Sequence, residues 1–207
     1  AWILNFVSKL SNNGVGCLLL ANGALSATGA EYEIRKQLIE NDLVEAIIVL
    51  PRNMFYTTNI SVTVWVFNKN KKARKVNKNE KEFEYRDRTN EILFMDLRNI
   101  GEPFEKKYIA FSKEDILRIS KIYHEWARKD GDYKDIKELC KSVKKDKLID
   151  YSLVTSKYIE FDRDKENIDY EEKMKEIQKE LKILYDDETR TKNAVFEIMK
   201  DLGYEIG

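Results

Sequence analysis

The segments most informative about the fold are two short apolar runs, residues 15–21 (VGCLLLA) and 43–50 (LVEAIIVL). Apolar runs of this length without strict alternation are typical of strands buried on both faces of a parallel sheet. The intervening residues 31–41 have helical spacing, with Ile34 and Leu38 on one face. Two buried strands joined by an amphipathic helix predict one half of a doubly wound α/β sheet.

Elements on either side extend this sheet. An apolar stripe within residues 2–10 predicts a helix, and residues 12–14 (NNG) are a pattern that ends helices. Residues 60–67 (ISVTVWVF) predict a strand that follows the 43–50 strand after a loop of about nine residues. A parallel neighbour needs a crossover of roughly a dozen residues or more. We therefore expect these two strands to be antiparallel, at the end of an otherwise parallel sheet.

The middle of the chain continues the alternation less clearly. Residues 92–97 (ILFMDL) predict another strand. Ser112 and Asp115 have nearly the spacing of a capping box and predict the start of a helix, which we expect to end at Gly131. Residues 134–147 are strongly charged, which predicts a helical segment or a linker. The middle of the chain therefore predicts one further strand, residues 92–97, and one further helix, which begins at Ser112.

The C-terminal residues have a heptad pattern. From Tyr170 onward, apolar residues recur in alternating steps of three and four, and Glu188 and Thr191 interrupt the seam. A narrow seam flanked by charges is typical of a helix that pairs with another helix, and the alternative is packing against its own domain. We expect contact between subunits through Met174, Ile177, Leu181, Leu184, Val195, Ile198 and Leu202. The expected organisation is an α/β domain over residues 1–130, a linker with a helical and aromatic segment over 131–168, and an assembly helix over 169–207.

Composition and charge argue against several classes of protein. Lys and Arg together number 37, as do Asp and Glu, and a neutral balance argues against a free-standing nucleic-acid binder. The sequence contains no run of about 18 apolar residues, which a transmembrane helix would need, so we expect no membrane partner. Cys17 and Cys140 lie far apart, and His124 falls inside a predicted amphipathic helix. We expect no disulfide, no metal site and no histidine-based catalytic centre, in a chain that works in the reducing cytoplasm.

Residues 68–81 are the most basic part of the chain, with seven Lys or Arg and one Glu. Such a segment is either a solvated loop or a loop that contacts phosphates beside an active site. The second interpretation names Lys69, Lys71, Lys72, Arg74 and Lys75 as candidate DNA contacts.

Spacing alone reveals no complete catalytic constellation. Gly14 and Gly16 precede or open a strand and do not join a strand to a helix, so they make no dinucleotide-binding loop. Acid pairs such as Asp186 and Asp187 are typical of a helix surface. The residues taken by themselves indicate part of a parallel α/β domain with a helical tail.

Residues 18–69 resemble the modification subunit of type I restriction-modification systems. The matching pieces, in chain order, are Asn22-Gly23, Gly29 with Glu33-Ile34-Arg35, Leu38-Ile39-Glu40, Leu50-Pro51, Phe55, Thr58-Asn59-Ile60 and Trp65. Residues 151–158 and the terminal helix resemble further parts of that family. The resemblance implies an N6-adenine DNA methyltransferase that uses S-adenosylmethionine. It also implies a Rossmann-like class I sheet with an antiparallel last strand, followed by a helical region.

The resemblance also identifies what this chain lacks. The family has a glycine-bearing cofactor loop and an Asn-Pro-Pro-aromatic motif, and both lie upstream of the matched region. The prolines here are Pro51 and Pro103, and neither follows an Asn or another Pro. We therefore expect a C-terminal portion of such a subunit, with no catalytic residue of its own, no bound S-adenosylmethionine and no activity in isolation.

The loop after residue 50 is where the resemblance places the target base. N6-adenine methyltransferases swing the base out of the duplex, and related enzymes stack it on an aromatic residue. The spacing implies Phe55 for that platform, with Tyr56 as a packing neighbour. Pro51, Asn22 and Gly23 are the other candidates for the target pocket. The alternative is that Phe55 only fills the end of the sheet.

The resemblance implies DNA, a specificity subunit and a restriction subunit as partners, with self-association through the terminal helix as a further expectation. A second hypothesis from a different class is a non-catalytic assembly module that couples to a specificity subunit through that helix. A third is a methyltransferase of similar fold that acts on RNA or protein.

Overall fold

The computed structural model describes residues 2–78, 81–161 and 170–204, and its contacts divide the chain into two units, Ala1–Asp162 and Arg163–Gly207. Over its described residues, 170–204, the second unit holds one helix, α4 (Tyr170–Asp201). The first unit contains α1 (Trp2–Lys9), β1 (Val15–Ala21), η1 (Asn22–Leu25), α2 (Ala30–Glu40), β2 (Val44–Val49), β3 (Val62–Asn68), β4 (Arg74–Lys78), β5 (Lys81–Tyr85), β6 (Glu91–Asp96), β7 (Glu102–Phe104), β8 (Tyr108–Ala110), α3 (Lys113–Ala127), β9 (Cys140–Lys144), η2 (Lys145–Lys147) and η3 (Thr155–Lys157).

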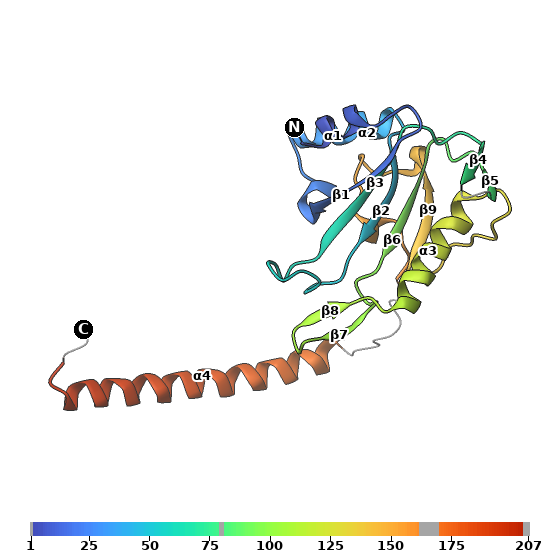
Figure 1. Cartoon of the computed structure of the whole chain (residues 1–207). Coiled ribbons are helices and arrows are strands. Elements are labelled where there is room, and N and C mark those ends of the chain that lie inside the picture. Colours follow the sequence, from blue (N-terminus) through green and yellow to red (C-terminus); the bar gives the residue numbers. More distant parts are fainter. Residues whose placement is uncertain (1, 79–80, 162–169, 205–207) are drawn as a thin grey trace. The chain divides into compact units, whose positions relative to one another are not determined.

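A five-stranded sheet in the order β1-β3-β2-β6-β9 forms the centre of the first unit (Figure 1). The expected antiparallel pairing of β2 with β3 is confirmed. The expectation of an otherwise parallel sheet with β3 at its end is wrong. β3 lies between β1 and β2 and is antiparallel to both. β6 and β9 are antiparallel, and β2 with β6 is the one pair of neighbouring strands in this sheet that is parallel. The apolar pattern of a strand reports which faces are buried and not the direction of its neighbours, so it could not reveal this arrangement.

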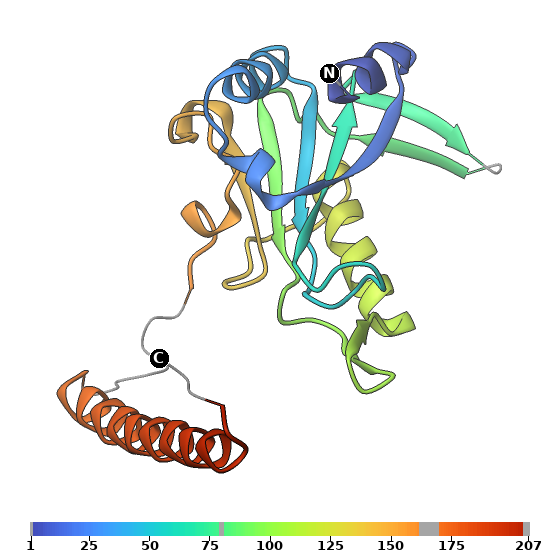
Figure 2. The same ribbon diagram turned by 90° about the vertical axis from the view of Figure 1, so that its left-hand side faces the viewer.

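Packing covers the two faces of the sheet differently. α1, α2 and the segment 148–159 cover one face, where Leu38, Trp65 and Leu153 are buried in a shared core. α3 covers the other face through Trp126, which is buried in a second core that also contains Met95. Figure 2 shows α3 and the 148–159 segment on opposite sides of the strands. This double cover explains why β2 is buried on both faces, as its sequence predicted.

β1 does not share this burial. Its residues alternate between exposed and half-buried, and Val15 and Leu19 are about half exposed. The prediction that this run is buried on both faces is wrong, because β3 is the one strand that β1 pairs with among the described residues. α1 packs closely on one face of β1. The ring of Phe6 lies so near Gly16 that it would clash with a Cβ atom added there.

The charged residues 134–147 contain β9, which pairs with β6 along the sheet. The expected helical segment or linker is therefore wrong here. Only Cys140 and Val143 of β9 are buried, so the strand is held mainly by its backbone pairing and offers little apolar pattern. α3 ends at Ala127, four residues before the expected glycine. The boundary expected near residue 130 thus falls inside the first unit.

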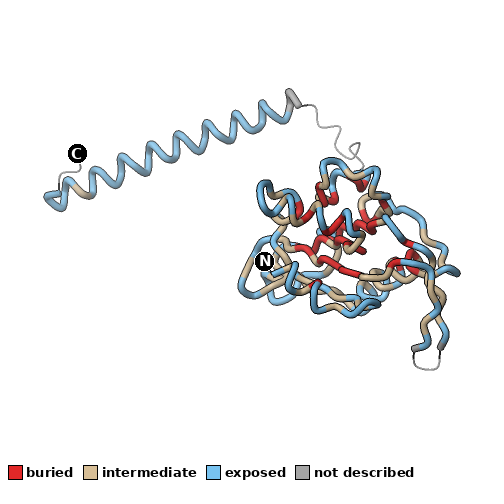
Figure 3. Tube along the Cα trace, turned by 90° about the horizontal axis from the view of Figure 1, so that it is seen from above, coloured by how far each residue is buried: buried red, intermediate tan, exposed pale blue. Residues whose placement is uncertain are grey.

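The terminal helix α4 is described by itself. Its end is a Schellman motif, in which Tyr204 N–H donates to Met199 O (2.9 Å) and Gly203, with a φ of +82°, donates to Lys200 O (3.0 Å). The seam residues are exposed, from 37% for Met174 to 65% for Leu202. Figure 3 shows this exposure along most of the helix, from residue 173 onward. No described helix is long and apolar enough to cross a membrane.

Candidate nucleic-acid interface at the carboxyl edge of the sheet

The carboxyl ends of β1, β2 and β6 lie at the same edge of the sheet. Ala21 is paired with Val62 and Val49 with Thr63, so the two strands that flank β3 end side by side. Val49 is also paired with Asp96, which brings the end of β6 to this edge. Ligands of open α/β sheets bind outside the carboxyl ends of the strands. This edge is therefore where the residues of a candidate site should be sought.

The loop between β2 and β3 projects from this edge and is tied at its base. Leu50 N–H donates to Val62 O (2.9 Å), and the Ser61 hydroxyl donates to Leu50 O (2.6 Å). At the tip, Thr58 N–H donates to Phe55 O (3.4 Å) in a tight turn. Asn53 has a φ of +58°, a conformation that Asn adopts more readily than most residues. The loop therefore holds its tip at a fixed place above the strand ends.

The two neighbouring aromatic residues of the tip differ in burial. Phe55 is half-buried and packs against the core on the α3 side. Tyr56 is 71% exposed, and its ring lies 4.7 Å from the ring of Tyr108 at an interplanar angle of 71°. Both line a polar depression whose other residues are Asn53, Thr57, Thr58, Asn59, Lys107 and Tyr108. Tyr56 packs against Tyr108 and is the more accessible of the two rings, and its expected role as a packing neighbour of Phe55 stays a prediction.

The other three predicted pocket residues lie at the same edge but outside this depression. Pro51 is buried directly after β2. The Asn22 side-chain oxygen accepts a hydrogen bond from the buried Thr63 hydroxyl at 2.6 Å, which joins the end of β1 to β3. Gly23 has open space around it, so its position requires no close approach of backbone. Their role in a target pocket stays a prediction.

A hairpin that the sequence reasoning missed completes the depression. β7 and β8 pair antiparallel, and Ile109 N–H donates to Asn53 O (3.0 Å), which ties the hairpin to the β2–β3 loop. The Lys107 ammonium lies 5.5 Å from the centre of the Tyr108 ring. Strands of three residues are too short for a periodic pattern, and some fifty residues separate them from the loop. Only the tertiary structure reveals this contact.

The basic segment lies at the opposite edge. β3 runs from the carboxyl edge to the start of β1, where Asn68 is paired with Val15. Its continuation forms a hairpin of β4 and β5, and not the expected loop. These residues therefore do not lie beside the β2–β3 loop.

Lys71 is a correction to the predicted phosphate contacts. It is 3% exposed, and its ammonium donates to Asp42 Oδ1 (2.6 Å), Val44 O (3.0 Å) and Glu91 O (2.5 Å). Burial lowers the pKa of this ammonium against the opposing effect of Asp42. A cation committed in this way cannot reach a phosphate. The prediction is wrong for Lys71, because residues distant in the sequence bury its ammonium and the local basic pattern does not reveal them.

The other four basic residues have varied surroundings. Lys69 donates to Leu10 O (2.7 Å). Arg74 donates to Asn70 O (2.7 Å), and its guanidinium lies 5.9 Å from the Tyr85 ring centre. Lys75 forms an exposed ion pair with Glu82 at 2.8 Å, and Lys72 is exposed. Their contact with DNA stays a prediction.

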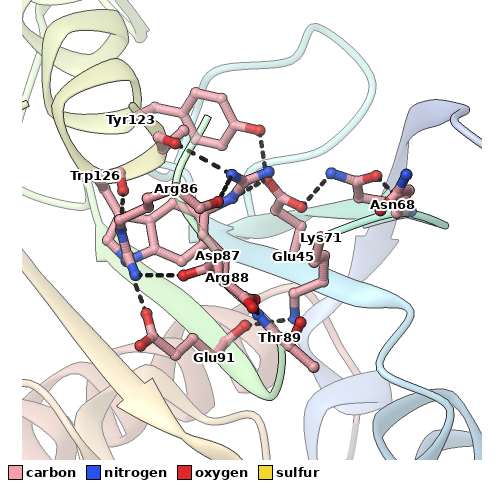
Figure 4. A network of polar contacts seen from close by, with 12 residues as sticks. Glu45, Asn68, Lys71, Arg86, Asp87, Arg88, Thr89, Glu91, Tyr123 and Trp126 are labelled. Atoms are coloured by element: carbon pink, nitrogen blue, oxygen red, sulfur yellow. Dashed lines mark hydrogen bonds and ion pairs between the residues drawn. The ribbon is translucent and has the colours of Figure 1, made fainter. Parts of the chain in front are cut away.

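Sequence reasoning also missed a buried polar network at this opposite edge (Figure 4). Glu45 is fully buried in β2 and accepts hydrogen bonds from Arg88 Nε (3.2 Å), the Tyr123 hydroxyl (2.9 Å) and the Asn68 amide (2.5 Å). Burial and the nearby Glu45 carboxylate raise the pKa of Tyr123. Arg88 is 2% exposed and also donates to Ala127 O (3.1 Å). The network joins β2, β3 and α3, and its buried groups hold the fold together without facing a ligand.

The described residues offer no other obvious chemistry. Within these ranges, no group of three or more His, Cys, Asp or Glu side chains could hold a metal ion. The connection from β1 to α2 is tied down, because the Arg35 guanidinium donates to Ala27 O (3.0 Å) and Tyr151 O (2.8 Å). These bonds join the connection both to α2, which carries Arg35, and to the segment that follows β9.

Known proteins resemble the chain over nearly its whole length. It is 32% identical over 209 residues to the Type I restriction enzyme HindI methylase subunit of Haemophilus influenzae, with 99% of this chain and 44% of that protein covered. The MjaIX methylase subunit of Methanocaldococcus jannaschii is 32% identical over 98% of this chain and 35% of its own length. The chain thus spans less than half the length of these relatives.

Solved structures share the fold. The type I restriction-modification methyltransferase subunit from Streptococcus thermophilus matches 77% of this chain and 30% of its own, with a TM-score of 0.62 and 24% identity. A second structure, solved to explain the complex assembly and conformational transition of the type I R-M system, matches 100% of this chain and 39% of its own chain. The TM-score is 0.55 and the sequence identity 15%. The family model for N-6 DNA methylases matches residues 1–167. The chain therefore belongs to the N-6 DNA methylase family.

Proposed function

We propose that this chain is part of the methylase subunit of a type I restriction-modification system, which transfers a methyl group from S-adenosylmethionine to N6 of an adenine in duplex DNA. The observation that carries this proposal is the match of the N-6 DNA methylase model to residues 1–167, together with relatives that are type I methylase subunits over 98–99% of the chain. In this proposal the cofactor loop and the catalytic motif belong to other parts of the complete subunit, and this chain contributes binding surfaces.

Phe55 is the platform for the target adenine in this proposal. Its ring is half-buried against the core, so its position is fixed before the base arrives, and it lines the depression at the carboxyl edge. Stacking a base on an aromatic ring contributes roughly 1–3 kcal/mol. Extruding a base costs a few kcal/mol. A fixed ring of this kind therefore offsets much of the cost of taking the adenine out of the stack.

The test replaces Phe55 with alanine in the complete subunit assembled with its partners. Loss of 1–3 kcal/mol of stacking corresponds to methylation roughly 5- to 150-fold slower. 2-Aminopurine in place of the target adenine gives a second readout, because stacking on the ring quenches the fluorescence of the extruded base. Phe83→Ala is the matched control, since Phe83 is half-buried on β5 under the Arg128 guanidinium, away from the carboxyl edge. Equal turnover of the Phe55 variant and the unchanged protein would show that Phe55 only packs.

The helix α4 is the assembly element in this proposal, and helices of a specificity subunit are its partner. Its seam exposes apolar side chains at heptad spacing between Met174 and Leu202, which is the chemistry of a helix that pairs with another helix. The restriction subunit and DNA complete the proposed set of partners. The alternative is a non-catalytic assembly module. It would be indicated if α4 binds the specificity subunit while changes in the first unit leave methyl transfer unaffected.

Paired substitutions test the seam. Leu181→Asp places a charge on the seam, whereas Ile183→Asp places one on a residue that is also exposed but lies off it. We expect the first to abolish co-purification with the specificity subunit and the second to retain it. Equal retention of both variants would exclude the seam as the contact, and formation of dimers by the chain alone would indicate self-association.

A further inference from the structure

The β7–β8 hairpin and the tip of the β2–β3 loop present one continuous surface to solvent. Ile109 N–H donates to Asn53 O (3.0 Å), and the rings of Tyr56 and Tyr108 meet edge to face. Side chains from both segments line the same polar depression. Two segments that are distant in sequence are thus held together at the edge of the sheet where ligands bind.

Tyr56 offers an aromatic face within this surface. Its side chain is 71% exposed, and the edge-to-face contact with Tyr108 supports it without covering both faces of its ring. An exposed ring held in place by a neighbour costs little further ordering when a flat ligand stacks on it. Bases of every type stack on such rings, because every base has a flat aromatic face.

A cation and amide groups accompany the ring. Lys107 is exposed at the turn of the hairpin, and its ammonium lies 5.5 Å from the centre of the Tyr108 ring. Lys106 precedes it in the turn and is also exposed. Asn59 lines the depression from the loop side. An aromatic face, a cation and an amide in one place match the base and the phosphate of a nucleotide.

The position of Tyr56 relative to Phe55 indicates which nucleotide it would take. The two residues are consecutive, so their Cα atoms are about 3.8 Å apart. Phe55 packs toward the core, while Tyr56 faces solvent. If the extruded adenine lies on Phe55, the nucleotides nearest to Tyr56 are those linked to that adenine along the same strand. The partner base on the other strand remains in the duplex and is farther away.

We propose that Tyr56 and Lys107 form a second nucleotide subsite, which holds a nucleotide next to the target adenine on the same DNA strand. The base stacks on Tyr56, and its phosphate contacts Lys107 at the turn of the β7–β8 hairpin. This inference rests on the proposed function, since it takes the target base to lie on Phe55. The hairpin is then a DNA-contacting element that limits how the extruded strand leaves the duplex.

Photo-crosslinking with 5-iododeoxyuridine tests the subsite in the complete methylase assembly. The analogue replaces, one at a time, the target base and the bases on either side of it, and the linked residue is mapped by mass spectrometry. We expect one flanking position to link to Tyr56 and the target position to link to Phe55. Tyr56→Phe should keep the flanking link, and Tyr56→Ala should lose it while methyl transfer persists at a reduced rate.

Two results overturn the subsite and leave the proposed function standing. One is a target position linked to Phe55 with no flanking position linked to Tyr56. The other is a target position linked to Tyr56 itself, which would make Tyr56 the platform. An assembly that neither methylates DNA nor links at the target position would instead refute the proposed function.

The lysine is tested through the salt dependence of DNA binding. Each phosphate contact contributes about 0.9 to the slope of log K against log salt concentration. Lys107→Gln should lower that slope by about one contact, and Lys147→Gln should leave it unchanged. Lys147 is the matched control, because it is exposed and follows Lys144, which is paired with Glu91 at the opposite edge of the sheet. An unchanged slope in Lys107→Gln, or loss of the specificity subunit from that variant, would show that the hairpin contacts protein and not phosphate.

Discussion

Replacing Arg88 with methionine should destabilise the first unit strongly, because Arg88 is the cation bonded to the fully buried carboxylate of Glu45. Arg88 and Glu45 have side-chain exposures of 2% and 0%, and Arg88 Nε lies 3.2 Å from Glu45 Oε1. Methionine fills a similar space without charge. Breaking a buried ion pair by removing one partner typically costs 3–5 kcal/mol, since the remaining charge is left uncompensated.

The structure places the expected loss near the lower end of that range. Glu45 would keep two hydrogen bonds, from the Tyr123 hydroxyl (2.9 Å) and the Asn68 amide (2.5 Å). Bonds of this kind to a charged group contribute about 1.5–3 kcal/mol each. We therefore expect Arg88→Met to lower the free energy of unfolding by about 3 kcal/mol. Adding Glu45→Gln to that variant removes the unpaired charge and should recover part of the loss.

Urea denaturation at neutral pH followed by tryptophan fluorescence measures this loss. Trp65 and Trp126 are both buried in the first unit, on opposite faces of the sheet, so together they report on its unfolding. Arg118→Met is the control, since Arg118 is exposed on α3 and should change stability by less than about 0.5 kcal/mol. A loss below about 1 kcal/mol for Arg88→Met, or a double variant no more stable than the single one, would refute the reasoning.

Three further predictions concern pH and helix capping. Burial lowers the pKa of the Lys71 ammonium below 10.5, so the unfolded chain binds this proton more tightly than the folded chain does. The free energy of unfolding should therefore rise with pH between the lowered pKa and 10.5. Urea denaturation at several pH values should show this rise in the unchanged protein and not in Lys71→Met. Burial raises the pKa of the Tyr123 hydroxyl above 10.0, so its contribution to the free energy of unfolding is fully present below pH 10.0 and is lost as the pH rises further. Tyr123→Phe should lose less stability over the same alkaline range. Ser112→Ala should cost about 1 kcal/mol in the same assay, while exposed Ser156→Ala should cost less than half of that, because Ser112 caps α3 in a complete capping box.

Local patterns in the sequence predicted much of the first unit. α2, β2, β3 and β6 lie where apolar spacing placed them, and the cap at Ser112 is confirmed. These features depend on side chains within a few residues of one another, which a single sequence displays directly. The antiparallel pairing of β2 with β3 followed from loop length alone, because no helical crossover fits in so short a connection.

The errors share one physical origin, which is that partners far away in the sequence decide burial. Lys71 belongs to a basic run that appears solvated, yet its ammonium is bonded to Asp42 and to the carbonyl groups of Val44 and Glu91. β9 is a strand because β6 offers a free edge, although its own sequence is mostly polar. Glu45, in the middle of an apolar run, gave no sign that Arg88 would reach it from 43 residues away.

The candidate site was predictable in location and only partly in composition. The β2–β3 loop could be placed at the carboxyl edge from its position between two strands, and its aromatic residues were visible in the sequence. The exposure of Tyr56 and the contact with Tyr108 could not be read in this way, because they depend on the β7–β8 hairpin. The relative roles of Phe55 and Tyr56 therefore rest on the crosslinking experiment and not on sequence spacing.

The two edges of the sheet differ in how their polar groups are used, and this difference supports the placement of the site. At the amino end of β2, the groups of Glu45, Arg88 and Lys71 are bonded to one another or to backbone, and all three are buried. At the carboxyl end, Tyr56 and Lys107 remain exposed around a polar depression. Burying polar groups is tolerated only when they are mutually satisfied, so these three side chains are not available to a ligand. The second edge keeps aromatic and cationic groups accessible, and these are the groups that a nucleic acid strand requires.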